Sequence, residues 1–252
     1  MGTYPGAVSK SDEVVSAPED QAPVRWGLGD VAVGWIVAQF GGLLAFYLVI
    51  AISGVDPDNT DDLSLGWVAL GQVGLWAGLL GIPLLAARAK GNGLVHDFGV
   101  RVAGRDWLTG ALTGLVTQLV LVPLLYLPLF TLFDVSSEQL EEPARGLTDR
   151  ATDPVGVALL VLIVGLGAPV IEEIFYRGLL QRALTNRWGL WPGIIGSAVL
   201  FAASHFQGLQ FPALMLLGLI LGYMTARAGR LGPAIFTHIA FNMVTVVFLV
   251  AG

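Results

Sequence analysis

The chain of 252 residues contains no cysteine, which excludes disulfide bridges, thiolate metal ligands and a cysteine nucleophile. Charged residues are also scarce, at 13% of the chain, whereas hydrophobic residues make up 55%. A soluble domain has about 25% charged residues, so this composition indicates a protein whose main solvent is lipid. The formal net charge of −6 gives no reason to expect a nucleic acid as a partner.

The first residues lack the pattern of a secretory signal peptide, because no basic stretch leads directly into an apolar run. From Met1 to about Ala22 the chain is instead polar and rich in proline and acidic residues. Such a segment has too little apolar surface to bury for folding. We therefore expect residues 1–25 to form a disordered cytoplasmic tail.

Seven segments are long and apolar enough, or nearly so, to cross the roughly 30 Å hydrocarbon layer as helices. The third contains Pro123 and Pro128, so we expect a kink or a break there, and a count of eight stays open. The sequence thus predicts an all-α, polytopic transmembrane helix bundle, with N-terminal helices in 26–150 and C-terminal helices in 151–252. The segments run approximately over Asp30–Ser53, Leu65–Ala87, Trp107–Phe133, Pro154–Arg177, Leu190–Phe206, Phe211–Ala226 and Leu231–Val250.

The loops between these segments alternate in charge. The loop 54–64 has aspartates but neither Lys nor Arg, and the loop after the third segment is also acidic. By the positive-inside rule, the basic loops lie in the cytoplasm, so we expect a cytoplasmic N-terminus and a C-terminus on the far side of the cell membrane. The basic loops contain Arg88, Lys90, Arg101, Arg105, Arg182, Arg187, Arg227 and Arg230.

Ionisable side chains inside spans are costly and usually face a bundle interior or a cavity. In this sequence they gather in the fourth, fifth and seventh segments. Glu173 and Arg177 are four residues apart and can pair along one helix face, while the adjacent Glu172 points about 100° away. One glutamate is then neutralised and the other is available for chemistry. A solvated ion pair at a cytoplasmic helix end is the alternative interpretation.

Two of the three histidines also lie in spans. His238 and Asn242 are four residues apart and share one face of the seventh segment, and His205 closes the fifth. Interhelical hydrogen bonds alone would account for either feature by itself. The combination with a carboxylate pair in the same half of the chain favours a shared site.

Taken together and in this order, Glu172-Glu173-xxx-Arg177, Phe201-xxx-His205 and His238-xxx-Asn242 resemble the motifs of the CAAX-protease and bacteriocin-processing family, also called the abortive-infection family. That family includes the Ras-converting CAAX endoprotease. The resemblance covers about residues 155–250, and the first half of the chain matches only as hydrophobic helices. It implies an intramembrane endopeptidase that hydrolyses a membrane-anchored substrate, whether prenylated and CAAX-type or not.

The resemblance also implies roles for the motif residues. Glu172 would be the general base that activates a water molecule, and Glu173 would pair with Arg177 and hold the shape of the site. Asn242 would stabilise the oxyanion. His205 and His238 would orient the water or bind a metal.

The question of a metal stays open at this point. Glu172, His205 and His238 match the ligand types of some hydrolytic zinc sites, in which case Glu172 would be a ligand and the protein a metalloprotease. The zincin motif HExxH is absent, and a metal-free glutamate mechanism uses the same residues.

Two other functions are compatible with these residues. A non-catalytic membrane protein that binds a partner, such as an immunity protein, would need no activated water. A proton or cation transporter would use intramembrane Glu and His, but transporters usually show repeated halves, and here the polar residues lie in one half only.

Overall fold

The computed structural model describes residues 23–132 and 135–251, and all the regular elements in these residues are helical. Six of the helices are long and apolar enough to cross a membrane. They are α1 (Leu28–Ser53), α2 (Leu65–Lys90), the continuous α4–η2–α5 helix (Asp106–Val116, Thr117–Leu121, Val122–Leu132), the continuous α7–η3–α8–η4–α9 helix (Pro154–Leu160, Val161–Gly167, Ala168–Glu172, Glu173–Leu180, Gln181–Trp188), α11 (Phe211–Ala228) and α12 (Gly232–Ala251). The predicted helical membrane bundle is therefore confirmed.

The seventh predicted span is a helix of only 14 residues, α10 (Leu190–Ala203). At about 1.5 Å per residue it is roughly 21 Å long, which is less than the hydrocarbon thickness of roughly 30 Å. Among residues 23–132 and 135–251, six helices are thus long enough for a full span, one fewer than the seven predicted. The sequence had suggested a helix that continues to Phe206, but the chain turns at Ser204. The predicted third span ran to Phe133, which lies outside the described residues.

Shorter elements connect the spans. They are η1 (Thr60–Asp62), α3 (Leu94–Phe98) and α6 (Ser137–Thr148). Of the tail expected over residues 1–25, residues 1–22 lie outside the described residues. The Arg25 backbone N–H donates to the Lys90 carbonyl at 2.7 Å, and the buried Trp26 ring packs edge-on against Phe98, so the chain is attached to the bundle from Arg25 onward.

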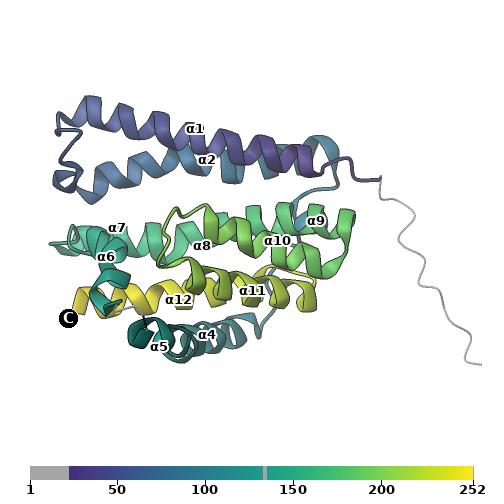
Figure 1. Cartoon of the computed structure of the whole chain (residues 1–252). Helices are drawn as coiled ribbons and strands as arrows, with labels where there is room; N and C mark the ends of the chain where they lie inside the picture. The colour runs from purple at the N-terminus through teal and green to yellow at the C-terminus, as the bar shows by residue number, and fades with distance from the viewer. Residues whose placement is uncertain (1–22, 133–134, 252) are drawn as a thin grey trace, which may run out of the picture.

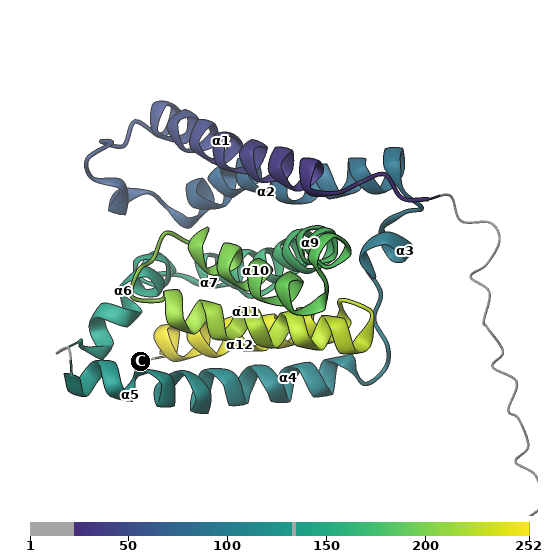
Figure 2. The ribbon, with the colours of Figure 1, turned by 45° about the vertical axis from the view of Figure 1, so that its right-hand side comes forward.

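The spans are arranged in layers (Figures 1 and 2). The α1–α2 hairpin forms one outer layer, and the α4–η2–α5 helix lies on the opposite side of the molecule. The long helix from α7 to α9, together with α10, α11 and α12, lies between them. The segments that carry the motif residues are therefore the central ones.

Glycines allow these layers to approach closely. A Cβ atom on Gly114 would lie 2.4 Å from the Thr237 carbonyl oxygen of α12, and one on Gly218 would lie 2.9 Å from Ala198 of α10. Both glycines belong to the small-xxx-small pairs 110/114 and 218/222. A larger side chain at either position would push the helices apart.

Proline explains where two helices change their winding. The π-helical segment η2 ends at Leu121, two residues before Pro123, and η3 ends at Gly167, two residues before Pro169. A proline ring clashes with the carbonyl of the preceding turn, and the wider π-helical turn makes room for it. The expected break near Pro123 is thus a π-helical segment within a continuous helix.

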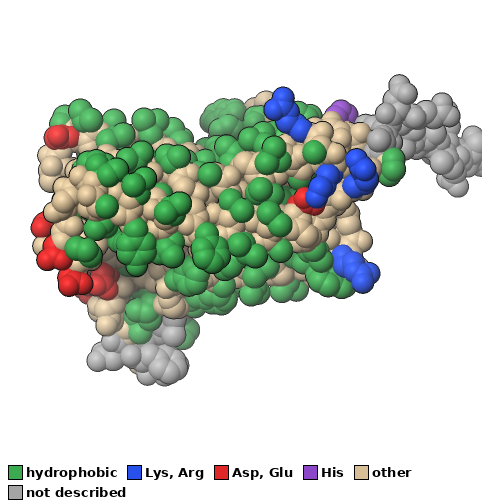
Figure 3. Space-filling model, turned by 90° about the horizontal axis from the view of Figure 1, so that it is seen from above, with side chains coloured by type: hydrophobic (Ala, Val, Ile, Leu, Met, Phe, Trp, Pro, Cys, Tyr) green, Lys and Arg blue, Asp and Glu red, His purple; other side chains and the backbone are tan. Residues whose placement is uncertain are grey.

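The two ends of the bundle carry opposite charge (Figure 3). Acidic side chains gather at the end formed by the α1–α2 loop and α6, and basic side chains gather at the end where α1 begins. Between these ends the visible surface is largely hydrophobic, as expected for helices surrounded by lipid.

Candidate active site

The long helix brings an ion pair into the centre of the bundle. Glu173 and Arg177, both fully buried, are joined by a 3.0 Å contact between Glu173 Oε1 and Arg177 Nη1, the pair that their i, i+4 spacing suggested. The guanidinium also donates to the Gly218 carbonyl at 3.4 Å and lies 4.3 Å from the centre of the Phe201 ring. Arg177 therefore neutralises Glu173 and connects the long helix to α10 and α11.

His238 of α12 contacts both glutamates of the long helix. Its Nδ1 lies 3.0 Å from Glu173 Oε1, and its Nε2 lies 3.8 Å from Glu172 Oε2. Because a carboxylate accepts hydrogen bonds, the Glu173 contact favours a proton on Nδ1 and leaves the Nε2 lone pair directed toward Glu172. The Glu172 side chain retains 15% exposure, whereas that of Glu173 has none. Glu172 is thus the accessible carboxylate of the pair.

His205 is held by the turn that follows α10. Its Nδ1 donates to the Phe201 carbonyl at 2.8 Å, so its Nε2 is the nitrogen left for other contacts. The Phe201 ring is fully buried and makes edge contacts with the rings of His205 at 4.9 Å and His238 at 5.6 Å. Phe201 therefore packs against both imidazoles and helps to position them, a role that was not predicted for this motif residue.

Asn242 lies one turn along α12 from His238, as its spacing requires. Its Nδ2 donates to the Val164 carbonyl at 2.9 Å. Val164 is in the π-helical segment η3, where the usual i+4 pairing of backbone carbonyls is altered. One N–H of the amide is thus used to fasten α12 to the long helix, and the second is available for a ligand.

Tyr176 and Ser204 lie close to these groups and were not predicted from the sequence. The Tyr176 hydroxyl donates to Ser204 Oγ at 2.6 Å, and the Ser204 hydroxyl donates to the Phe201 carbonyl at 2.8 Å. Tyr176 is one turn beyond Glu172 on the same helix, and Ser204 directly precedes His205. This position beside two motif residues was the only available signal, because a buried Tyr is usually a core residue.

The three residues considered as metal ligands are not gathered into one set. Across residues 23–132 and 135–251, no group of three or more His, Asp or Glu side chains is arranged to hold a metal ion. Glu172 and His238 approach each other at 3.8 Å, whereas the ring contacts of His205 in the described structure are with Phe201. The arrangement therefore does not fit a Glu172–His205–His238 zinc site, and we assign no step to a metal.

Comparison with known proteins finds a family model that matches the part of the chain containing this site. Residues 154–244 match the model of the Rce1-like family, described as type II CAAX prenyl endopeptidase Rce1-like. The matched region contains every motif residue discussed above. No solved structure matches the chain.

Two curated bacterial proteins are similar to the chain. An uncharacterized 24.3 kDa protein of Escherichia coli is 30% identical over 97 residues, which are 36% of this chain and 45% of that protein. A Bacillus subtilis protein named "Putative membrane peptidase YdiL" is 22% identical over 223 residues, 86% of each chain. The chain thus spans about half the length of the first relative and most of the second. The C-terminal part of the chain, which contains all the motif residues, is therefore similar to the type II CAAX prenyl endopeptidases of the Rce1-like family.

Proposed function

We propose that this protein is an intramembrane endopeptidase that hydrolyses a membrane-anchored peptide with a water molecule activated by Glu172. The observation that carries the proposal is that His238 contacts two carboxylates, one of which is buried in an ion pair and the other partly exposed. Glu173 is fixed by Arg177, whereas Glu172 is partly exposed. Catalytic sites commonly contain a group that is held in place by a hydrogen bond to a second residue, and here Glu173 holds His238 beside the freer carboxylate of Glu172.

In the proposed reaction, Glu172 accepts a proton from water as the water oxygen attacks the carbonyl carbon of the scissile peptide bond. The carbonyl becomes an oxyanion, for which the second N–H of Asn242 is the proposed donor. His205, whose Nδ1 proton is held by the Phe201 carbonyl, is proposed to accept a hydrogen bond at Nε2 and so to orient the water. Collapse of this intermediate breaks the C–N bond, and protonated Glu172 returns its proton to the leaving amine. Glu173 and Arg177 are proposed to hold His238 in place throughout.

The proposed substrate is a peptide tethered to the lipid bilayer. The match to a family described as CAAX prenyl endopeptidases makes a prenylated CAAX-type peptide the first candidate, and a non-prenylated membrane peptide the second. We also propose that the N-terminus is cytoplasmic, because the basic loops all lie at the end where α1 begins.

Hydrolysis of fluorogenic peptides by the purified protein in nanodiscs tests the proposal. We expect Glu172→Gln and His238→Ala each to lower kcat by about 10²–10⁴-fold, the range measured for loss of general acid–base catalysis. We expect His205→Ala to lower kcat as well. Each peptide is assayed in prenylated and non-prenylated form.

Two matched variants serve as controls for these substitutions. Glu142→Gln removes an exposed carboxylate of α6, and His96→Ala removes the histidine to which the sequence gives no role. Both should hydrolyse peptide at the wild-type rate. Equal activity of Glu172→Gln and the wild type would show that another group is the base, and absence of hydrolysis by the wild type would favour a partner-binding protein.

A further inference from the structure

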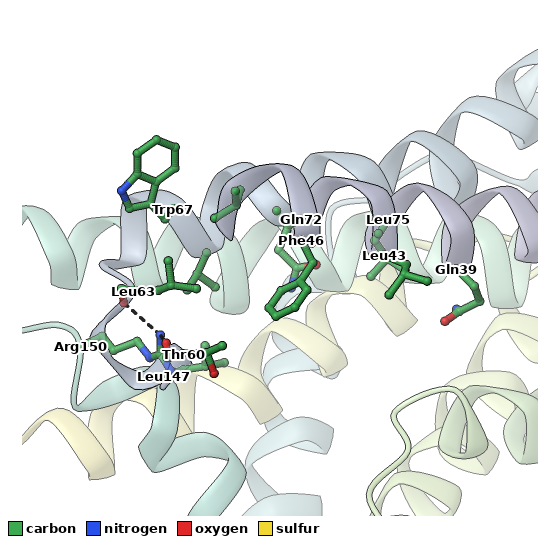
Figure 4. A pocket seen from close by; sticks show the side chains of 14 residues that line it. Gln39, Leu43, Phe46, Thr60, Leu63, Trp67, Gln72, Leu75, Leu147 and Arg150 are labelled. Carbon is green, nitrogen blue, oxygen red and sulfur yellow. Dashed lines mark hydrogen bonds between the residues drawn. The ribbon is translucent and has the colours of Figure 1, made fainter. Parts of the chain in front are cut away.

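The inner face of the α1–α2 hairpin contains a cavity of about 500 Å³ that is separate from the glutamate–histidine cluster (Figure 4). It is lined along one side of α1 and α2, and Leu147 and Arg150 border it at the acidic end of the bundle. Most of its lining is apolar. Its size suits an extended chain or a small ligand.

Two glutamines interrupt this apolar lining. Gln39 of α1 and Gln72 of α2 both line the cavity, and Figure 4 shows their side chains pointing from the hairpin toward the rest of the bundle. Among the described residues, neither side-chain amide has a hydrogen-bond partner. Gln39 is about 17 Å along α1 from its first residue, near the middle of the bilayer. Polar groups at that depth normally face a partner or a ligand.

The spacing of the two amides can be read from the hairpin contacts. Gly41 packs on Gly74 and Gly78 packs on Ala38, which brings Gln72 level with Leu43. The two amides are therefore four residues apart in depth, or about 6 Å. In an extended chain, backbone groups on the same edge recur every two residues, at about 6.6 Å. An amide side chain donates and accepts as a peptide group does, so the difference in depth between the two amides matches the repeat of backbone groups along an extended peptide.

A lipid chain is a poorer match for the same cavity. A hydrocarbon tail would leave both amides without partners in an apolar medium, which is unfavourable. Arg150 offers no ready site for a lipid phosphate, because its Nε and Nη1 donate to the carbonyls of Gly146, Thr60 and Leu63, and its Nη2 contacts Asp61.

The inner end of the cavity approaches the depth of the proposed base, Glu172. Trp76 of α2 packs at Gly167, and Gly34 of α1 packs at Phe175, so the stretch of the long helix between Gly167 and Phe175 lies beside the inner end of the cavity. Glu172 is within that stretch, five residues from Gly167, which is about 7 Å along the helix axis.

From these observations we infer that the α1–α2 cavity binds an extended segment of a membrane-embedded peptide, with Gln39 and Gln72 pairing with its backbone. The inference rests on the proposed function in one respect, since it takes the bound peptide to be the substrate. Apolar side chains of the peptide would contact Leu43, Phe46 and Leu75, which also line the cavity.

Disulfide capture tests binding without any need for turnover. Because the chain has no cysteine, one introduced thiol is unique. The full-length protein would carry Glu172→Gln together with Phe46→Cys in the cavity, or with Leu44→Cys on the lipid-facing side, where Leu44 is 72% exposed. The probe is a synthetic peptide rich in Val, Thr and Ala that is fused to an apolar anchor helix and contains one cysteine.

We expect capture at Phe46→Cys and not at Leu44→Cys, and we expect Gln39→Leu with Gln72→Leu to slow capture at Phe46→Cys by about tenfold or more. In active protein, the same double substitution should raise KM by about tenfold and change kcat less than about twofold, while Leu44→Ala changes neither.

Equal capture on both faces, or capture unaffected by the glutamine substitutions, would overturn the inference. So would a bound lipid in the purified protein that the peptide does not displace. Capture by a protein that hydrolyses no peptide would support the cavity and refute the proposed endopeptidase.

Discussion

At the scale of single residues, the site depends on charges that have been removed from solvent. Glu173 and Arg177 are both fully buried, and beyond their mutual contact Glu173 Oε2 and Arg177 Nε have no hydrogen-bond partner in the described structure. Desolvating two ions is costly, and each depends on the other for compensation. The pair is therefore better explained by the orientation it gives to His238 than by a gain in stability.

Removing one member of this pair should destabilise the fold. We expect Arg177→Met to lower the free energy of unfolding by about 3–5 kcal/mol, because Glu173 would remain as an uncompensated buried charge. Adding Glu173→Gln should recover much of the loss. Steric trapping or thermal unfolding in bicelles would measure both effects. If the double variant were less stable than Arg177→Met alone, the buried charge would not be the cause.

The hydroxyl contact between Tyr176 and Ser204 should contribute to the position of His205. We expect Tyr176→Phe and Ser204→Ala each to cost about 1 kcal/mol of stability, and the double variant to cost less than the sum of the two. A thermodynamic cycle on unfolding measures this coupling. Strictly additive losses would show that the two hydroxyls act independently.

The sequence revealed part of this arrangement. The Glu173–Arg177 contact follows from helical spacing alone, as does the shared face of His238 and Asn242. The contact between Tyr176 and Ser204 joins two helices, and the rotation of one helix against another is not encoded in either segment's own periodicity. For the same reason the sequence did not indicate that the Phe201 ring contacts both His205 and His238.

At the scale of helices, the sequence predicted the apolar spans better than the shorter elements. Seven apolar segments could be located from composition, because a span requires a long run of apolar residues. The helix α6 was not predicted, although Ser136 and Gln139 form a capping box that the sequence displays. The length of α10 was also misjudged, because the first glycine after Ala203 is Gly208, four residues beyond Ser204, where the helix ends.

A glycine substitution tests the packing of α4 on α12. We expect Gly114→Ala to cost about 1–3 kcal/mol, because its Cβ would lie 2.4 Å from the Thr237 carbonyl oxygen. Gly81→Ala is the matched control: it lies inside α2, and its Cβ would meet nothing within 4 Å. This control should be neutral or stabilising by up to about 1 kcal/mol. Equal losses at both positions would point to a general effect of glycine replacement.

At the scale of the whole molecule, the separation of acidic and basic ends predicts an orientation. With the N-terminus in the cytoplasm, a cysteine introduced by Asp58→Cys should react with a membrane-impermeant maleimide in intact cells. Arg105→Cys should react only after the cells are opened. Both positions are exposed, and the natural chain has no thiol to interfere. The reverse pattern of labelling would invert the proposed topology.

The shortness of α10 has a consequence for the surrounding lipid. After 14 residues the chain turns back toward α11, well before a bilayer of normal thickness would end. The turn's polar backbone is partly satisfied there, since the Tyr126 hydroxyl donates to the Leu209 carbonyl and the Gln210 amide to that of Leu140. We therefore expect lipid headgroups and their hydration to dip inward along this edge. Such a dimple would bring bulk water close to His205, and thicker membranes with longer acyl chains would slow the proposed hydrolysis because the dimple would cost more free energy to form.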